Sequence, residues 1–165
     1  MQLLTGQDAL ARLAHGDIEA LTEAATAATF YGASLNDAQI AANKRIVTIS
    51  TGTCEAAAAS ADNIFLAAFV DNRLAGYVIG TRHAPDSHEL DWLMVHPDFH
   101  GSPVSHALMD AGLEWLGRSH PIWLSVIAFN TRAIRFYEKF GFIVDPDAKT
   151  AHLVPRYIMR REATA

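Results

Sequence analysis

The chain has little cysteine, few charged residues and no long hydrophobic run. Its single cysteine, Cys54, cannot form an internal disulfide, so nothing indicates an oxidising compartment. The longest fully apolar run, from Ile64 to Val70, is far shorter than the roughly 20 residues that cross a bilayer. The first twenty residues lack a basic start, so we expect no secretory signal. With 165 residues, half of them apolar, residues 1–165 are expected to form a single cytoplasmic domain rather than a disordered chain.

Charge is distributed unevenly along the chain. Residues 1–117 hold 5 basic and 14 acidic side chains, whereas residues 118–165 hold 8 basic and 4 acidic ones. A formal net charge of −5 argues against general binding of nucleic acid. The split has two readings: it is without function, or a cationic substrate approaches the acidic part while an anionic cofactor lies elsewhere.

The pattern of apolar and turn-forming residues predicts a mixed α/β order. An alanine- and leucine-rich helical segment is expected over Asp8–Thr29, with a break at Gly16 and Asp17, and a second helix is expected over Ala38–Ala42. The later expected strands are Ile64–Asp71, Leu74–Thr81, Glu89–Val95, Ile122–Ala128, Phe142–Val144 and Tyr157–Met159, with helices over Pro103–Leu116 and Thr131–Phe140. Residues 44–60 are left open, because Ile46–Ile49 favours a strand while the Ala56–Ala59 run obscures the period.

Two segments carry the clearest chemical signal. The first runs from Glu89 through His96-Pro97 into Pro103, a strand that ends in a loop and enters a helix. That geometry aims several backbone N–H groups at one point and suits a phosphate. The second, from Asn130 to Phe142, reads Asn-Thr-Arg-Ala-Ile-Arg-Phe-Tyr-Glu-Lys-Phe-Gly-Phe.

Together these segments resemble the GNAT superfamily of N-acetyltransferases, clearly over residues 64–142 and weakly before them. The second segment matches each fixed position of the family pattern Asn-x-x-Ala-x-x-Phe-Tyr-x-x-x-Gly-Phe. The resemblance implies a central, mostly antiparallel sheet flanked by about four helices, with a splayed parallel pair formed by Glu89–Val95 and Ile122–Ala128. It also implies acetyl-CoA as co-substrate, held by Leu93, Met94, Val95, His100, Gly101, Ser102, Val104, Ser105, His106 and Asn130.

The cofactor loop departs from the family pattern Gln/Arg-x-x-Gly-x-Gly/Ala. Here His100 replaces the Gln or Arg, Pro103 the first glycine and Ser105 the second small residue. Pro103 removes one N–H that could face a pyrophosphate, which costs on the order of 1 kcal/mol because other amides and water compensate. Ser105 adds bulk near the cofactor, and His100 is a cation only when protonated. Weaker cofactor binding is the expected consequence.

Two residues, Tyr137 and Glu89, are candidates for the chemistry itself. Tyr137 lies where the resemblance places the acid that protonates the coenzyme A sulfur, although a half-buried helix aromatic is the alternative. Glu89 lies where some members place a carboxylate base; the alternative is a solvated start of the strand. On a period of two, Glu89, Asp91, Leu93 and Val95 share one face, and two adjacent carboxylates raise one pKa. Asn130 is expected to contact the cofactor, to cap the following helix, or to do both.

The acceptor end and a metal site are less well specified. The resemblance implies that Phe30-Tyr31-Gly32 and the stretch His152–Tyr157 shape the acceptor pocket. Their aromatic residues line this pocket in one reading and close the core in the other. Five histidines fall between residues 83 and 106, but the spacing lacks the helical zinc-protease pattern, so we expect no metal. A lone thiol such as Cys54 is typical of a small buried hydrophobe.

The sequence therefore predicts acetyl transfer from acetyl-CoA to a primary amine of a small molecule or peptide, by direct attack. Tyr137 and Glu89 are the expected catalytic residues, and Asp91 an expected substrate contact. The alternative is a non-catalytic binding or regulatory module that kept the fold but lost a good cofactor loop; a longer acyl-CoA is a further alternative. No nucleic-acid or membrane partner is expected, and a second copy of the chain is a candidate partner.

Overall fold

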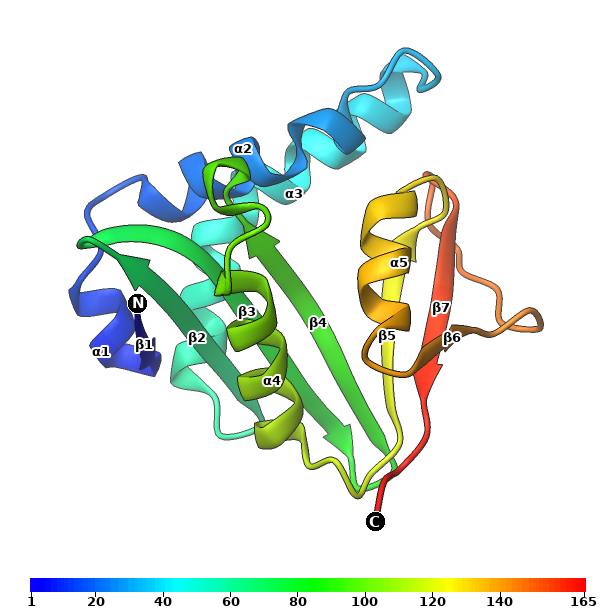
Figure 1. The fold of residues 1–165 in the computed structure, drawn as a ribbon. Coiled ribbons are helices and arrows are strands. Elements are labelled where there is room, and N and C mark those ends of the chain that lie inside the picture. Colours follow the sequence, from blue (N-terminus) through cyan, green and yellow to red (C-terminus); the bar gives the residue numbers. More distant parts are fainter.

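A seven-stranded sheet organises the computed structural model, which describes residues 1–165 (Figure 1). The strands lie in the order β1-β2-β3-β4-β5-β7-β6, and only β4 and β5 run parallel. Their bounds are β1 Gln2–Thr5, β2 Asn63–Val70, β3 Arg73–Ala84, β4 Ser87–Val95, β5 Ile122–Ile127, β6 Phe142–Val144 and β7 Arg156–Arg161. The mixed α/β architecture with one parallel pair is confirmed.

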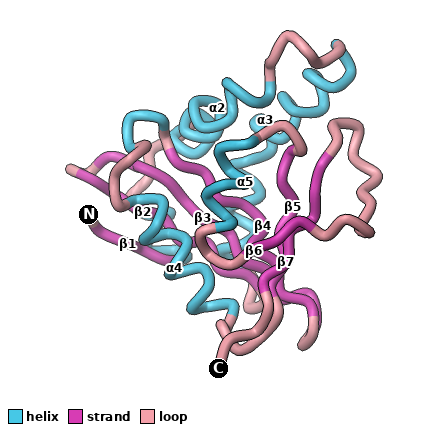
Figure 2. The backbone as a smooth tube through the Cα atoms, turned by 45° about the vertical axis from the view of Figure 1, so that its right-hand side comes forward, coloured by secondary structure: helices cyan, strands magenta, loops and turns pink.

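Helices cover both faces of this sheet (Figure 2). They are α1 Gly6–Ala11, α2 Asp17–Phe30, α3 Asp37–Ala59, α4 Val104–Leu116 and α5 Thr131–Glu138, with a short 3₁₀ turn, Pro97–Phe99, before α4. One face packs against α4 and α5, and the other against α1, α2 and α3. No helix combines the length and the apolar character needed to cross a bilayer.

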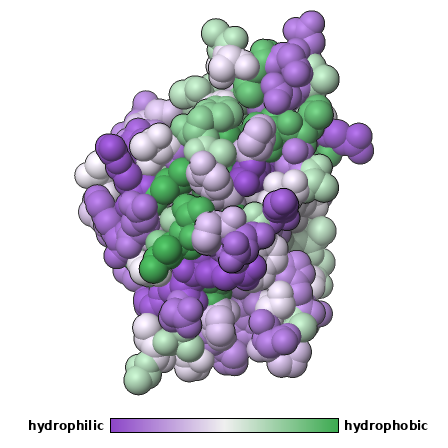
Figure 3. Space-filling model, turned by 90° about the vertical axis from the view of Figure 1, so that its right-hand side faces the viewer, coloured by the Kyte–Doolittle hydropathy of each residue, from purple (hydrophilic) through white to green (hydrophobic).

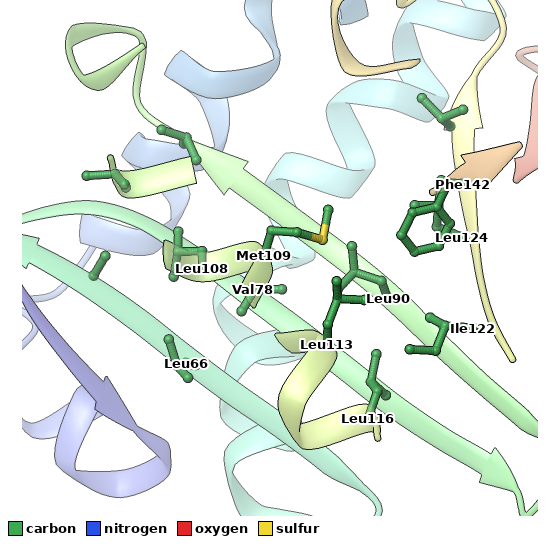
Figure 4. Close-up of a cluster of buried hydrophobic side chains, with 14 of the residues drawn as sticks. Leu66, Val78, Leu90, Leu108, Met109, Leu113, Leu116, Ile122, Leu124 and Phe142 are labelled. Atoms are coloured by element: carbon green, nitrogen blue, oxygen red, sulfur yellow. The ribbon is translucent and has the colours of Figure 1, made fainter. Parts of the chain in front are cut away.

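The larger core lies between α4 and the sheet (Figure 4). Leu108, Leu113 and Leu116 recur at helical spacing and are fully buried against Val78 and Leu90 of the strands. Burying each such side chain stabilises the fold by roughly 1.5–3 kcal/mol, so this contact fixes the position of α4 on the sheet.

Close approach at the same face requires a glycine. A Cβ placed on Gly76 would lie 2.7 Å from the carbonyl oxygen of Met94 and 2.9 Å from a Leu108 methyl carbon. The backbone of β4 cannot move away cheaply, because it is paired to β3 at this point. Gly76 therefore sets how closely the end of β4 and α4 approach β3.

The β2–β3 hairpin forms where the sequence predicts it. Val70 pairs with Arg73, and the two residues between them, Asp71 and Asn72, have φ of 50° and 62°. Left-handed conformations at both central positions match the right-handed twist of the flanking strands.

The first sixty residues differ most from expectation. Residues 44–60 lie in α3, so a strand over Ile46–Ile49 is wrong. The buried positions of α3, at Asn43, Val47, Ser50, Cys54 and Ala57, follow alternating steps of four and three, which is a helical period that overrides β-branched propensity.

Two further features go beyond the sequence prediction: an additional short strand and an additional helix. The short strand β1 pairs with β2 at the edge of the sheet and has no counterpart in the sequence prediction. There are also five α-helices rather than about four.

A bulge in β4 changes which residues share a face. Trp92 pairs with Ile79 and Leu90 with Gly80, so Asp91 is an extra residue without a partner on β3. Beyond it, Leu93 and Val95 pack on the α4 side, whereas Trp92 and Met94 pack on the α3 side. The expectation that Leu93 and Val95 share a face with Glu89 is wrong, because the bulge shifts the alternation by one residue.

Candidate functional site

A cleft of about 1680 Å³ opens where β4 and β5 separate. The two strands pair only through His88 with Ile122 and Glu89 with Trp123, and then diverge, as Figure 1 shows. The remainder of β4 therefore has no strand partner on this side. The splayed parallel pair lies where the sequence predicts it.

Most residues named from the sequence line this cleft. Those on its wall are Phe30, Glu89, Asp91, Leu93, Met94, Val95, His100, Gly101, Ser102, Ser105, His106, Asn130 and Tyr137. Two lie elsewhere. The side chain of Val104 is buried in the core beside α4, and Tyr31 donates a hydrogen bond of 2.7 Å to Glu23 outside the cleft.

Unpaired backbone amides lie at one end of the cleft, in the first turn of α4. The N–H of Val104 reaches the Ser102 hydroxyl at 3.4 Å, and that hydroxyl donates to the Phe99 carbonyl at 2.6 Å. The N–H groups of Ser105 and His106 have no acceptor within the protein. Free amides at a helix N-terminus, where the helix dipole is positive, form an anion-binding site.

Three cationic residues line the same cleft: Arg132 and Arg135 of α5, and Lys139 at the C-cap of this helix. They belong to the basic C-terminal part of the sequence. An anion attracted to that part would therefore bind at this wall of the cleft. Burial and the nearby charge of Arg132 hold the pKa of His100 below its usual value. His100 is therefore neutral at pH 7 and adds a hydrogen-bonding group rather than a charge.

Glu89 lies in a network of titratable side chains on the other side of the sheet. The Nε2 of His83 is 2.7 Å from Oε1 of Glu89, and the His83 ring stacks on Trp123 with centroids 5.8 Å apart. Burial and the nearby charge of Asp91 raise the pKa of Glu89 to about 7, while His83 opposes the rise. Burial also raises the pKa of Asp91. A carboxylate with this pKa is half ionised near neutral pH and suits proton transfer.

Tyr137 and Asn130 lie on α5 at the cleft wall. Burial raises the pKa of Tyr137 to about 12, so its hydroxyl keeps its proton at neutral pH. Its ring packs edge-on against Phe136 and Phe142, at centroid separations of 5.8 and 6.2 Å. The side chain of Asn130 accepts a hydrogen bond from the Ala133 N–H at 3.2 Å, so it caps α5 while it lines the cleft.

Two further residues line the cleft from β5 and β7: Ser125, which sequence reasoning missed, and Arg156, which lies in the stretch His152–Tyr157 expected at the acceptor pocket. The hydroxyl of Ser125 and the Nε of Arg156 are buried without a hydrogen-bond partner. Ser125 pairs with Ile158 and Ile127 with Arg156, so the cross-strand register brings them to one face. No local pattern marks Ser125 or singles out Arg156 within its stretch, because their positions depend on strand pairing over some thirty residues.

The histidines and the cysteine do not form a metal centre. No group of three or more His, Cys, Asp or Glu side chains is arranged to hold a metal ion. Cys54 is fully buried in the core formed with α1 and α2, and burial raises the pKa of its thiol to about 12. The thiol is therefore packed as a small hydrophobic group.

Solved structures with the same fold are found at low sequence identity. The PaiA N-acetyltransferase of Thermoplasma acidophilum, solved in complex with coenzyme A, has a TM-score of 0.71 at 21% identity, covering 98% of this chain and 99% of that one. Ard1 of Thermoplasma volcanium has a TM-score of 0.67 at 19% identity and covers 100% of both chains. At these identities the likeness concerns the fold.

Sequence relatives point the same way. Uncharacterized N-acetyltransferases of Mycobacterium tuberculosis and Mycobacterium bovis are 35% identical over 99 residues, which is 56% of this chain and 62% of theirs. The match thus spans less than two thirds of those relatives. Residues 25–142 match the acetyltransferase (GNAT) family, and these residues hold the splayed strands, the free amides of α4 and the whole of α5. The chain therefore belongs to the acetyltransferase (GNAT) family.

Proposed function

We propose that this chain transfers an acetyl group from acetyl-CoA to a primary amine of a small molecule or peptide. The observation that carries the proposal is that one cleft joins free helix-terminal amides, a neutral tyrosine and a carboxylate whose pKa is about 7. An anion site, a hydrogen-bond donor and a base are the groups that this reaction needs.

The residues present fit acetyl-CoA. The N–H groups of Ser105 and His106, with Arg132 and Arg135 opposite on α5, would hold the phosphates. Leu93–Val95 lacks a strand partner on the β5 side, so its backbone would pair with the amides of the pantetheine arm. When bound, acetyl-CoA supplies an activated thioester.

Glu89 would remove the proton from the acceptor. A primary amine has a pKa of about 10.4 and is an ammonium at pH 7, whereas only the neutral amine attacks a carbonyl. With a pKa of about 7, Glu89 is too weak a base to deprotonate the free ammonium fully, so it would accept the proton, directly or through a water, as the nitrogen attacks and its N–H becomes more acidic. His83, at 2.7 Å, holds the carboxylate in one orientation.

Tyr137 would stabilise the departing sulfur. An alkyl thiol has a pKa of about 8.5, well below the value of about 12 for Tyr137. Complete proton transfer from Tyr137 to sulfur is therefore uphill, and the hydroxyl would act by donating a hydrogen bond to the developing negative charge. Of the two protons that the ammonium loses on becoming an amide, one would go to Glu89 and the other, through water, to the departing sulfur.

A non-catalytic module is the second candidate, favoured by the loop before α4. Pro103 occupies the N-cap of α4 and contributes no N–H, and the side chain of Ser105 lines the cleft. Both reduce what the loop can offer to a pyrophosphate. A binding module with this fold would hold a ligand in the cleft and transfer nothing.

The experiment that separates the two follows the release of free thiol from acetyl-CoA in the presence of a panel of amines, amino acids and short peptides. Transfer requires amine-dependent thiol release and an acetylated product of the expected mass. Glu89→Gln should lower the rate by about 10²–10⁴, whereas Glu55→Gln, an exposed carboxylate on α3, should not change it. Binding of acetyl-CoA without transfer to any acceptor would favour the module.

A further inference from the structure

Two buried polar atoms in this structure lack a hydrogen-bond partner, and both belong to residues that line the cleft. They are the hydroxyl oxygen of Ser125 on β5 and Nε of Arg156 on β7. Buried polar groups are nearly always paired, because leaving one unpaired costs about 1–3 kcal/mol. Two such atoms at one place indicate a polar group that joins them when the cleft is filled.

Ser125 and Arg156 lie at the acceptor end rather than at the phosphate end. Leu124, Val126 and Met159, which alternate with them on β5 and β7, pack in the core beneath α4. Ser125 and Arg156 therefore point to the opposite face, together with Trp123. Trp123 pairs with Glu89 and stacks on His83, so the orphaned groups share a face with the proposed base.

The charges at this end are of both signs and remain apart. Arg156 takes part in none of the six ion pairs of the structure. The charge of Asp91 nevertheless lowers the cost of burying the Arg156 guanidinium, and both residues line the cleft, Asp91 from β4 and Arg156 from β7. A carboxylate pair on β4 and an unpaired guanidinium on β7 therefore line the acceptor end together.

We propose that the acceptor is a zwitterion, an amine that also carries a carboxylate, as in an amino acid. Arg156 and Ser125 bind the carboxylate, while Glu89 and Asp91 face the ammonium. The assignment rests on the proposed function and names the substrate class for it.

A carboxylate fits this end of the cleft better than a phosphate. The guanidinium fork matches a carboxylate, and the Ser125 hydroxyl adds a donor beside it. One cation beside Asp91 balances a monoanion, whereas a phosphate dianion would leave a net negative charge near two carboxylates. A diamine without a carboxylate would leave Arg156 unpaired and would meet a like charge.

The test uses matched acceptors that differ only by the carboxylate: amino acids and the amines obtained by their decarboxylation, such as L-lysine and 1,5-diaminopentane. For each pair, kcat/KM is measured in the wild type and in Arg156→Gln with saturating acetyl-CoA. The quantity that decides is the wild-type preference for the amino acid divided by the preference of the variant. In this double ratio the intrinsic reactivities of the two amines cancel.

The proposal predicts a double ratio of at least about tenfold, the size of a lost charge-assisted hydrogen bond, carried by KM rather than kcat. Arg160→Gln is the matched control: it lies on the same strand but binds Asp145 at 2.8 Å outside the cleft, and its double ratio should be one. If Arg156→Gln does not fold, Ser125→Ala should still reduce the preference by about threefold.

The possible outcomes are distinct. Turnover of both members of each pair with a double ratio near one overturns the zwitterion assignment alone and leaves amine acetylation standing. Absence of turnover with every amine and every amino acid, although acetyl-CoA binds, overturns the proposed function and this inference with it.

Discussion

Replacing Asp91 and replacing His83 should shift the pH dependence of acetyl transfer in opposite directions. Burial and the charge of Asp91 raise the pKa of Glu89 to about 7, while the hydrogen bond and charge of His83 lower it. Asp91→Asn removes one cause of the rise, so the acidic limb of the rate profile should move to lower pH. His83→Asn removes the opposing contact, so the limb should move to higher pH.

The magnitude follows from the ionised fraction of Glu89. With a pKa of about 7, roughly one molecule in eleven has an ionised Glu89 at about pH 6 and ten in eleven at about pH 8, a tenfold difference in active enzyme. Asp91→Asn should bring this ratio towards one, and His83→Asn should increase it. The direction of each shift is the decisive quantity.

The assay measures initial rates across this pH range, with one acceptor for all proteins so that the acceptor's own ionisation cancels between variants. Glu89→Gln supplies the reference, because it should lose the limb itself along with most of the rate. Shifts of Asp91→Asn and His83→Asn in the same direction would refute the reasoning. So would an unchanged limb in Glu89→Gln.

The same raised pKa makes a prediction about stability. A carboxyl that titrates at about 7 when folded and 4.5 when unfolded binds more protons in the native state between these values. Its contribution to stability is therefore complete below about pH 4.5 and is lost as the pH rises through 7. Glu89→Gln should reduce this loss, by on the order of 3 kcal/mol at most, in unfolding experiments at either end of the range.

Three further predictions concern single residues. Tyr137→Phe should lower turnover at least about tenfold and leave the affinity for acetyl-CoA unchanged in a calorimetric titration; an unchanged turnover would remove Tyr137 from the chemistry. Pro103→Gly restores an N–H at the start of α4 and should tighten acetyl-CoA binding by on the order of 1 kcal/mol, whereas unchanged affinity would mean that this N–H is not needed. Gly76→Ala should destabilise the fold by about 1–3 kcal/mol, because its Cβ would meet the Met94 carbonyl oxygen at 2.7 Å. Gly52→Ala in α3, whose Cβ would have no packing neighbour within 4 Å, should stabilise the fold by about 0.5–1 kcal/mol. Chemical denaturation measures both changes, and equal shifts in the free energy of unfolding would contradict the packing argument.

The local sequence pattern predicts the elements of the fold correctly where hydrophobic period, turn residues and helix caps agree. From Ile64 onward, alternation, turn residues and helix caps point to the same elements, and the structure has each of them within a few residues. Ile46–Ile49 fails because β-branched propensity is weaker than the helical spacing of the buried residues around it. The strand β1 is not predicted, because a strand of four residues at a sheet edge has almost no hydrophobic periodicity.

The candidate site was predictable where it follows local sequence and not where it depends on distant pairing. The loop before α4 and the residues Asn130 and Tyr137 could be named because a motif marks them. The bulge at Asp91 could not be seen, since it depends on the register with β3. Arg156 reaches the cleft, and His83 reaches Glu89, only through the sheet order, which places β7 beside β5 and β3 beside β4.

One face remains without an assigned partner. Ile143 on the edge strand β6 and Tyr157 on its neighbour β7 are exposed, and hydrophobic patches alternate with hydrophilic ones on this side of the molecule (Figure 3). Dimerisation remains a prediction, and light scattering of the purified protein at increasing concentration would reveal it.

The central claim is that the cleft between β4 and β5 holds acetyl-CoA in spite of Pro103 and Ser105. Calorimetric titration of the purified protein with acetyl-CoA tests it most directly. We predict binding of one molecule per chain with a micromolar Kd. The absence of a heat change on titration with acetyl-CoA, and likewise with coenzyme A, up to millimolar concentration would contradict the claim.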